Sequence, residues 1–416
     1  MRTVFSGAEI FDGTGAAPAA ADVAVEDGRI VDVGPGLDGD ESVDVTGRTL
    51  LPGLFDTHVH VMIAHLDIFR IVQTPFSYRF YEAIHNLRAT LDIGITTVRD
   101  AGGADLGLKQ ALLDGLIEGP RVQLSISMLS QTGGHGDCWQ VSGCELPMFV
   151  AHPGRPSGLV DGPEQMRRKV RELIRAGADV IKVATSGGVL SPRDDPRHGH
   201  FRDAEIAVLV EEATAAGIFV MAHAQATEGI KVAIRNGVRS IEHGIYLDDE
   251  AIAMMLDRGT WLVPTLVAPR GVIEAADAGM GLPPAVVAKA RMVMEQHTDS
   301  VRRAIDAGVR VAMGTDSGVT PHGQNLRELP LMAGCGMTPE QVLHATTLSA
   351  ARLLGVDREL GSLEPGKRAD LVIIDGDALA LDDLDRRVRA VYQDGRLVSG
   401  VSEPGLRPGG GPGRPV

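Results

Sequence analysis

The sequence predicts an α/β protein: a (β/α)8 TIM-like barrel with a small composite β-sandwich domain built from both chain ends. Short β-rich runs occupy the two ends, strand-like apolar runs alternate with helical patterns between them, and the alternating runs number eight. Such alternation indicates parallel βα units, and eight units close a barrel. The expected domains are a β-sandwich formed by residues 1–52 and 365–403, a barrel over 53–364, and a disordered tail over 404–416.

The β-rich ends are expected to join in one small antiparallel sheet. Turn signals such as Asp12-Gly13, Asp27-Gly28 and Asp394-Gly395 separate short runs of strand-forming residues, as in strands connected by tight turns. These runs cover residues 2–10, 22–26, 29–33, 42–44, 366–375 and 388–398. From residue 404 onward the chain is mostly Pro, Gly and Arg, which offers too little apolar surface to fold.

The eight central runs are the expected barrel strands. They cover residues 51–58, 96–99, 121–127, 180–184, 219–223, 240–243, 261–264 and 311–314. Helical patterns lie between them; one is predicted over 162–177, because Pro163 is near its start and Gly177 is past its end. A barrel of this kind carries its active site at the carboxyl ends of its strands. Polar residues that end the runs are therefore the candidate site.

The composition restricts the class of partner and the compartment. A formal net charge of −15 without a basic cluster argues against nucleic acid or an anionic membrane, and we expect a small-molecule substrate, with homo-oligomerisation left open. Cys138, Cys144 and Cys335 are too few and too scattered for a disulfide framework. The N-terminus lacks the apolar segment of a signal peptide, and no run of 18 apolar residues occurs. A cytoplasmic protein is expected.

The pair His58 and His60 ends the first barrel run. Side chains two residues apart on a strand point to the same face, so both imidazoles converge on one point, as metal ligands do. The alternative is a pair of core or surface histidines that alternate by chance. The rest of the chain favours the metal site, because further ligand-type residues recur beside the other strand-like runs.

Four such residues fall at the same rim of the predicted barrel. Lys182 lies within the fourth run, His223 and His243 end the fifth and sixth runs, and Asp316 follows the eighth. A charged lysine inside an apolar strand is costly unless it is paired or chemically altered. A neutral lysine amine can take up carbon dioxide to form a carbamate, whose two oxygens can bridge two metal ions.

With this set of ligands the chain resembles the metal-dependent amidohydrolase superfamily. The resemblance covers the whole chain, including the segment over 361–371 that leads back into the β-domain. The stretches over 96–103, 133–136, 182–189 and 344–346 look like the branch of imidazolonepropionase-related enzymes and of metal-dependent prolidases, the Xaa-Pro and Xaa-Arg/Lys dipeptidases.

The resemblance implies a role for each ligand. His58, His60 and Asp316 hold one divalent ion, His223 and His243 hold the other, and carboxylated Lys182 bridges them. Nitrogen and oxygen ligands without thiolate suit Zn2+, with manganese, cobalt, nickel or iron as alternatives. Two ions make a hydroxide available near neutral pH. Asp316 then moves its proton to the leaving nitrogen; the alternative role of Asp316 is a helix N-cap.

Residues on the loops are the candidates for substrate contact. His135, in a glycine-rich loop, is expected to donate a hydrogen bond to the substrate carbonyl or oxyanion, and with Asp316 and His243 it completes the expected catalytic set. His322 follows the eighth run and is a second candidate. Gln225 stands where the prolidase branch has a tyrosine that touches the reacting carbonyl, a departure that bears on dipeptide specificity.

Four arginines are candidates to hold a substrate carboxylate through a bidentate contact. They are Arg193, Arg197, Arg202 and Arg270. The first two lie in a Pro- and Arg-rich loop over 191–200 that also carries His198 and His200 and either forms a lid or is a solvated loop. The sequence does not choose among the arginines.

The sequence is therefore interpreted as a binuclear metal-dependent hydrolase of the amide or peptide C–N bond of a small substrate, an N-acyl amino acid or dipeptide. The alternative enzyme is a mononuclear cyclic amidase of the imidazolonepropionase type, and Lys182 discriminates between the two. A catalytically silent barrel that serves as an assembly partner is the alternative of another class. It predicts missing ligands, and none is missing from the sequence.

Overall fold

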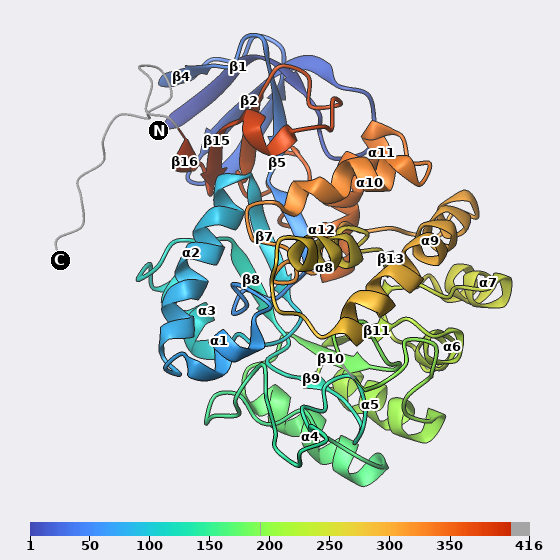
Figure 1. The fold of residues 1–416 in the computed structure, drawn as a ribbon. Helices are drawn as coiled ribbons and strands as arrows, with labels where there is room; N and C mark the ends of the chain where they lie inside the picture. Colours follow the sequence, from blue (N-terminus) through green and yellow to red (C-terminus); the bar gives the residue numbers. More distant parts are fainter. Residues whose placement is uncertain (192, 401–416) are drawn as a thin grey trace. The chain divides into compact units, whose positions relative to one another are not determined.

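The computed structural model of the protein describes residues 1–191 and 193–400. The tail expected over 404–416, and the last three positions of the range 365–403, lie outside the described residues. The chain divides into two compact units, whose elements are labelled in Figure 1. The first unit comprises Met1–Phe55, Thr90–Thr97 and the chain from Thr338; the second comprises Asp56–Ala89 and Val98–Met337.

The first unit contains an eight-stranded sheet in the order β16-β15-β14-β5-β1-β2-β3, with β4 paired to β1. Its strands are β1 (Arg2–Ile10), β2 (Ala19–Glu26), β3 (Arg29–Gly34), β4 (Glu41–Asp44), β5 (Arg48–Pro52), β14 (Leu371–Asp375), β15 (Val388–Gln393) and β16 (Arg396–Gly400). Both chain ends contribute, since β14 pairs antiparallel with β5. The expectation of a purely antiparallel sheet was wrong, because β1 pairs in parallel with β4 and β5.

The parallel pairing follows from the path of the chain after the β2–β3 hairpin. The backbone N–H of Asp40 donates to the carbonyl of Arg2, so the chain returns to the end of the sheet at which β1 begins. The core of this unit is apolar, and Phe5 packs edge-on against buried Tyr392 with ring centroids 4.9 Å apart. Helices α11 (Pro339–Thr346) and α12 (Leu348–Leu354) and the short η2 (Leu384–Arg387) also belong to this unit.

The strands that end in the second unit form two parallel sheets, ordered β6-β7-β8 and β13-β12-β11-β10-β9. They are β6 (Leu54–Val59), β7 (Ile95–Asp100), β8 (Arg121–Leu124), β9 (Met128–Leu129), β10 (Val180–Ala184), β11 (Phe219–Ala224), β12 (Ser240–His243) and β13 (Trp261–Val263). The run expected over 51–58 is divided between β5 and β6. At the division, a side chain on Gly53 would place its Cβ 2.2 Å from Thr96 Oγ1.

The eighth predicted run, 311–314, is not a continuous strand, but it follows its neighbours through backbone hydrogen bonds. Val311 forms a parallel bridge with Leu262, and the N–H of Ala312 donates to the carbonyl of Leu262. On the other side, the N–H of Thr57 on β6 donates to the carbonyl of Met313. The run therefore lies between β13 and β6, next to the histidine pair.

Helices alternate with the strands of the second unit. They are α1 (Ile68–Gln73), α2 (Tyr78–Asp92), α3 (Leu106–Leu113), α4 (Pro163–Arg175), α5 (Asp203–Ala215), α6 (Thr227–Arg235), α7 (Asp249–Arg258), α8 (Val267–Asp277), α9 (Pro284–Asp306), the short η1 (Asn325–Arg327) and α10 (Glu328–Gly334). Figure 1 shows α4 to α7 following one another outside β10 to β13. The predicted helix at 162–177 is confirmed as α4. Within residues 1–191 and 193–400, no helix has the length and apolarity needed to span a membrane.

Candidate metal centre

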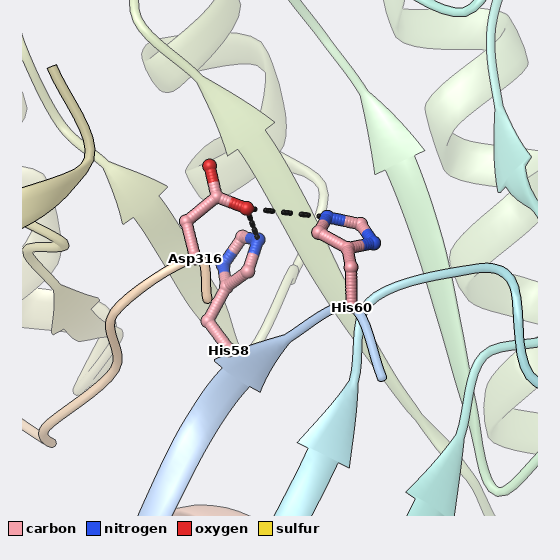
Figure 2. Close-up of side chains that lie close together, drawn as sticks. All are labelled: His58, His60 and Asp316. Carbon is pink, nitrogen blue, oxygen red and sulfur yellow. Dashed lines mark ion pairs between the residues drawn. The ribbon is translucent and has the colours of Figure 1, made fainter. Parts of the chain in front are cut away.

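The histidine pair at the end of β6 meets Asp316 from the segment after the eighth run. The Asp316 Oδ1 atom lies 3.4 Å from His58 Nε2 and 3.2 Å from His60 Nε2. Figure 2 shows the two rings pointing toward the same carboxylate oxygen. These three ligand atoms all lie within 4.8 Å of one another, which is a spacing that a single metal ion can fill.

The second ring nitrogen of each histidine of the pair has a fixed partner. His58 Nδ1 lies 2.7 Å from Glu242 Oε2, and His60 Nδ1 lies 2.8 Å from the carbonyl oxygen of Gly102. A carbonyl oxygen can only accept a hydrogen bond, so His60 Nδ1 is the protonated nitrogen and the neutral ring keeps its lone pair on Nε2. Such partners fix the orientation of a metal-binding imidazole.

The other two predicted histidines adjoin this pair. The ring centroid of His243 lies 5.1 Å from that of His58 and 4.6 Å from that of His223. His243 Nδ1 is 2.7 Å from Thr265 Oγ1, and His223 Nε2 is 3.1 Å from the carbonyl of Gly187. A carbonyl can only accept, so His223 Nε2 carries the proton and Nδ1 of the neutral ring keeps its lone pair. Burial holds the pKa of both rings well below 6.5, so both are neutral and suited to bind a cation.

Lys182 reaches the same place from β10. Its side chain is 1% exposed, and its Nζ atom lies 3.3 Å from His58 Nε2. Burial lowers the pKa of this amine to about 8, which makes the neutral, nucleophilic form accessible near neutral pH. The structure thus brings together all six residues that the strand pattern predicted: His58, His60, Lys182, His223, His243 and Asp316.

The backbone at two of these residues adopts an uncommon conformation. His243 and Asp316 have φ values of 72° and 62°, in the left-handed region that non-glycine residues rarely occupy and that often marks functional sites. Although burial raises the pKa of Asp316, the imidazoles of His58 and His60 hold it well below 3.8. The N-cap interpretation of Asp316 was wrong, because the next helical segment in the described chain is η1, which begins at Asn325.

Three charged residues behind the ligands were missed by the sequence interpretation. Glu242 on β12 is fully buried; besides contacting His58 it accepts a hydrogen bond from Arg99 Nη2 at 3.0 Å. Despite its burial, the charge of Arg99 holds the pKa of Glu242 at about 2. Asp56 accepts from Thr315 Oγ1 at 2.6 Å and so ties β6 to the segment that carries Asp316. The sequence could have revealed these residues, because a charged side chain inside an apolar run is as unusual at these positions as it is at Lys182.

A small cavity of about 40 Å³ opens beside the histidines. His135 lies at its wall, with its ring stacked on that of His223 at a centroid distance of 4.1 Å. Gln225 also lines the cavity, and its buried Oε1 atom has no hydrogen-bond partner among the described residues. Apolar side chains form most of the remaining wall, namely Val189, Leu190, Ile245, Ala268, Pro269, Val272 and Val319.

Comparison with known proteins decides the family. The family model described as "Amidohydrolase family" matches residues 49–398. The chain belongs to the amidohydrolase family. It is 34% identical over 381 residues to ochratoxinase from Aspergillus niger, covering 87% of this chain and 77% of the relative. It is also 27% identical over 388 residues to imidazolonepropionase from Geobacillus sp. strain WCH70, covering 85% of this chain and 83% of the relative.

A solved Xaa-Pro dipeptidase with bound methionine in its active site is similar in structure, with a TM-score of 0.88, 32% identity, and coverage of 96% of this chain and all of that chain. The predicted resemblance to the imidazolonepropionase and prolidase branch is thus confirmed. This family member is a hydrolase acting on C–N bonds.

The remaining predicted site residues lie apart from the cavity wall of this amidohydrolase. Arg193 is exposed and lies over the Trp139 ring, and Arg202 precedes α5 and donates to the carbonyl of Phe201. Arg197 is paired with Asp195, and Arg270 is absent from the wall. His322 is placed behind the pair, with its Nε2 atom 3.1 Å from the carbonyl oxygen of His60.

The loop over 186–200 is fastened to the body of the second unit. Ser186 and Gly199 form an antiparallel bridge across it. Lys289 on α9 donates to the carbonyls of Gly188 and Ser191 and to the carboxylate of Asp194. His198 is exposed, whereas His200 is buried. The described part of this loop is therefore held in place by the partly buried ammonium group of Lys289.

Proposed function

We propose that this chain is a binuclear metal-dependent amidohydrolase that cleaves the amide or peptide C–N bond of a small substrate, an N-acyl amino acid or a dipeptide. The observation that carries the proposal is the convergence of His58, His60 and Asp316 on one point, with one ligand atom of each within 4.8 Å of the others. Two imidazoles and one carboxylate directed at a common point are donors of the type that a divalent ion such as Zn2+ takes.

The donor set fits two divalent ions. His58, His60 and Asp316 would hold one ion, His223 and His243 the other, and Lys182 carboxylated by CO2 would bridge them. Imidazole and carboxylate donors without thiolate favour Zn2+. When bound, the ions polarise the scissile carbonyl and lower the pKa of the attacking water. The lowered pKa of Lys182 supports the carbamate, because only the neutral amine reacts with CO2.

The chain's own groups would then move protons and hold the substrate. Asp316, which stays ionised because of its histidine neighbours, takes the proton of the attacking water on a carboxylate oxygen and passes it to the leaving nitrogen. His135 donates to the substrate oxygen from Nε2. Its Nδ1 atom lies 2.7 Å from Ser191 Oγ and 3.5 Å from Asp194, and these contacts hold the ring in place.

The substrate class is inferred from the cavity and from the relatives. Gln225 presents an amide to the cavity, and the apolar wall beyond it suits an apolar group on one side of the scissile bond. A dipeptidase of similar structure holds methionine, an apolar amino acid, in its active site.

We further infer that the strands close into an eight-stranded (β/α)8 barrel over 53–364, with the site at its carboxyl rim, and that 1–52 and 365–403 form a β-sandwich.

The second candidate function is a mononuclear cyclic amidase of the imidazolonepropionase type. One observation favours it: His58, His60 and Asp316 by themselves form a complete group of three ligands, and a single ion needs no bridging lysine. The similarity to imidazolonepropionase is in keeping with this alternative. Lys182 separates the two functions, because only the binuclear centre uses it as a ligand.

Metal analysis of a Lys182→Ala variant tests the proposal. We expect the wild type, purified with Zn2+ and bicarbonate, to hold two ions per chain, and the variant to lose at least one ion together with hydrolysis of N-acyl amino acids and dipeptides. Added propionate should restore part of both, because a free carboxylate can replace the missing bridge. One ion per chain in the wild type and full activity in the variant would remove the binuclear mechanism.

A matched lysine variant controls for nonspecific loss of metal. Lys169 lies on α4 at the surface of the same unit and pairs with Glu172, so Lys169→Ala should retain the wild-type metal content and activity. Equal losses in both variants would mean that the Lys182 effect is not local to the site.

A further inference from the structure

A second cavity, of about 190 Å³, lies in the second unit, and none of the six candidate metal ligands lines it. Its wall is apolar and aromatic, with Ile71 and Val72 from α1 and Phe76, Phe80 and Phe149 from neighbouring segments. The wall also holds two arginines, Arg79 and Arg155, and its other polar side chains are Thr74 and His152. The cavity is large enough for a ring-sized group, and its chemistry combines a hydrophobic body with two cations.

The two guanidinium groups lie on either side of one phenylalanine. The Cζ atoms of Arg79 and Arg155 are 5.1 Å and 4.9 Å from the Phe149 ring centroid. Each also donates to backbone carbonyls, Arg79 to Met148 and Arg155 to Val150. The ion pairs found over residues 1–191 and 193–400 include neither arginine. The carboxylates nearest to Arg155 in charge effect, Asp100 and Asp105, act on it from beyond ion-pair distance.

Arg155 is the less satisfied of the two. Its side chain is 6% exposed, and its Nε atom is buried without a hydrogen-bond partner among the described residues. Burial, with a further contribution from the charge of Arg79, lowers the pKa of Arg155 to about 10. Burial of a cation whose counter-charges lie beyond ion-pair distance is costly. If the arginines served only to hold carbonyls in place, a neutral donor would do so without this cost.

An anion in the cavity would remove that cost. A guanidinium group presents planar, paired donors that match a carboxylate, and the aromatic wall excludes a strongly hydrated anion such as free phosphate. We propose that the Arg79–Arg155 cavity binds the carboxylate of an apolar organic acid, with the carboxylate on the two guanidinium groups and the apolar body against Phe76 and Phe80. The four arginines proposed from the sequence do not line this cavity; they are Arg193, Arg197, Arg202 and Arg270.

The cavity shares a wall with the candidate metal centre. The Phe149 ring centroid lies 6.2 Å from that of His60, and Gly103, which lines the cavity, follows the residue whose carbonyl orients His60. A side chain at Gly103 would place its Cβ 2.5 Å from Phe149, so the close approach requires glycine. The bound acid is therefore either the carboxylate end of the substrate, an assignment that rests on the proposed function, or a separate molecule beside the centre.

A binding experiment tests the site independently of catalysis. The probe is 4-fluorophenylacetate, followed by 19F NMR titration of the metal-loaded protein, with 4-fluorophenylacetamide as the uncharged analogue. We expect Arg155→Gln to weaken binding of the acid by about tenfold or more, the loss expected for a hydrogen bond to a charged group, and to leave binding of the amide little changed. The metal content of each sample is measured as well, because weaker binding of the acid at unchanged metal content cannot come from loss of an acid bound to the metal ions.

A pair of tryptophan variants on α1 tests the location. Val72 is 46% exposed and lines the cavity, whereas Phe69 is 64% exposed on the same helix and does not. Val72→Trp should block the acid by about tenfold, whereas Phe69→Trp should bind it as the wild type does. Unchanged binding of the acid in both Arg155→Gln and Val72→Trp, with thermal unfolding as in the wild type, would overturn the proposal.

A kinetic experiment distinguishes the two sources of the acid. For an N-acyl-phenylalanine and its carboxamide, Arg155→Gln should raise the KM of the acid at least about tenfold more than that of the carboxamide if the substrate supplies the carboxylate. An equal effect on both substrates, together with loss of 4-fluorophenylacetate binding, assigns the cavity to a separate acid. Absence of any hydrolysis would contradict the proposed function, and the binding experiment would still decide the site.

Discussion

Replacement of Glu242 by glutamine should weaken both the fold and the metal centre. Glu242 is fully buried and contacts three side chains, accepting from His58 Nδ1 at 2.7 Å, from Arg99 Nη2 at 3.0 Å and from Ser240 Oγ. Glutamine has nearly the same shape but no charge, and one of its two terminal groups is a donor. It leaves the Arg99 side chain, which is 3% exposed, as a buried cation without its counter-charge.

The magnitude follows from that burial. Removal of one partner from a buried ion pair costs about 3–5 kcal/mol of unfolding free energy. Loss of the carboxylate that orients a metal-binding histidine lowers metal affinity by about 10–100-fold. The pKa of Glu242 is about 2, so the wild-type carboxylate is ionised throughout the accessible pH range and the deficit should not depend on pH between about 5 and 8.

The assays are urea unfolding at fixed Zn2+ and competition for Zn2+ with a chelator. A double variant, Glu242→Gln with Arg99→Met, provides the control, because removal of both charges should recover at least about 1.5 kcal/mol of the lost stability without recovering metal affinity. Stability within about 0.5 kcal/mol of the wild type and unchanged Zn2+ affinity in the single variant would refute the assignment of Glu242 as the residue that orients His58.

Three further predictions concern residues around the site. Burial raises the pKa of Glu328 from 4.5 to about 8, so between these pH values the folded protein keeps a proton that the unfolded chain loses. The free energy of unfolding should therefore fall by up to about 1.4 kcal/mol per pH unit as the pH rises through this range. Glu328→Gln should flatten this slope in unfolding measured across the same range. Gly188→Ala would place a Cβ 2.3 Å from His135 Cε1 and should lower kcat by at least about tenfold. Gly281→Ala is the control, because Gly281 has open space around it, and this variant should keep the wild-type kcat. Equal kcat values for the two variants would contradict a role for the close packing of Gly188 against His135. Lys289→Met removes the cation that fastens the loop over 186–200 and should lower kcat without loss of bound metal, as a rate assay with metal analysis will show; a variant with the wild-type rate would count against this role of the loop.

The strand pattern and the residue chemistry were enough to predict which candidate ligands lie close together. Side chains alternate along a strand, and in parallel strands the carboxyl ends meet, so His58, His60, His223 and His243 were predicted to share one rim from local spacing alone. Lys182 stood out because a cation does not belong in the run Val180–Ala184. These arguments use only neighbours in sequence, and the structure does place these side chains next to one another.

The arginine cavity shows the opposite case. Its two cations are 76 residues apart in the chain, at Arg79 and Arg155, and meet on Phe149, which lies in a segment without regular secondary structure. No periodicity predicts the position of such a segment, since loop conformation depends on what it packs against. The sequence interpretation accordingly chose arginines such as Arg193 and Arg202, which the structure places away from both cavities.

The sequence by itself determined the family and the place of the candidate ligands at the strand ends, because these depend on residue identity and on the two-residue period of a strand. Only the tertiary structure decided which charges support the ligands. Glu242 meets His58 across 184 residues of chain and Asp56 meets Thr315 across 259, and such pairs form only when parallel strands come together. The substrate-binding walls belong to the same class, because they are built from loops whose shape is set by packing and not by local pattern.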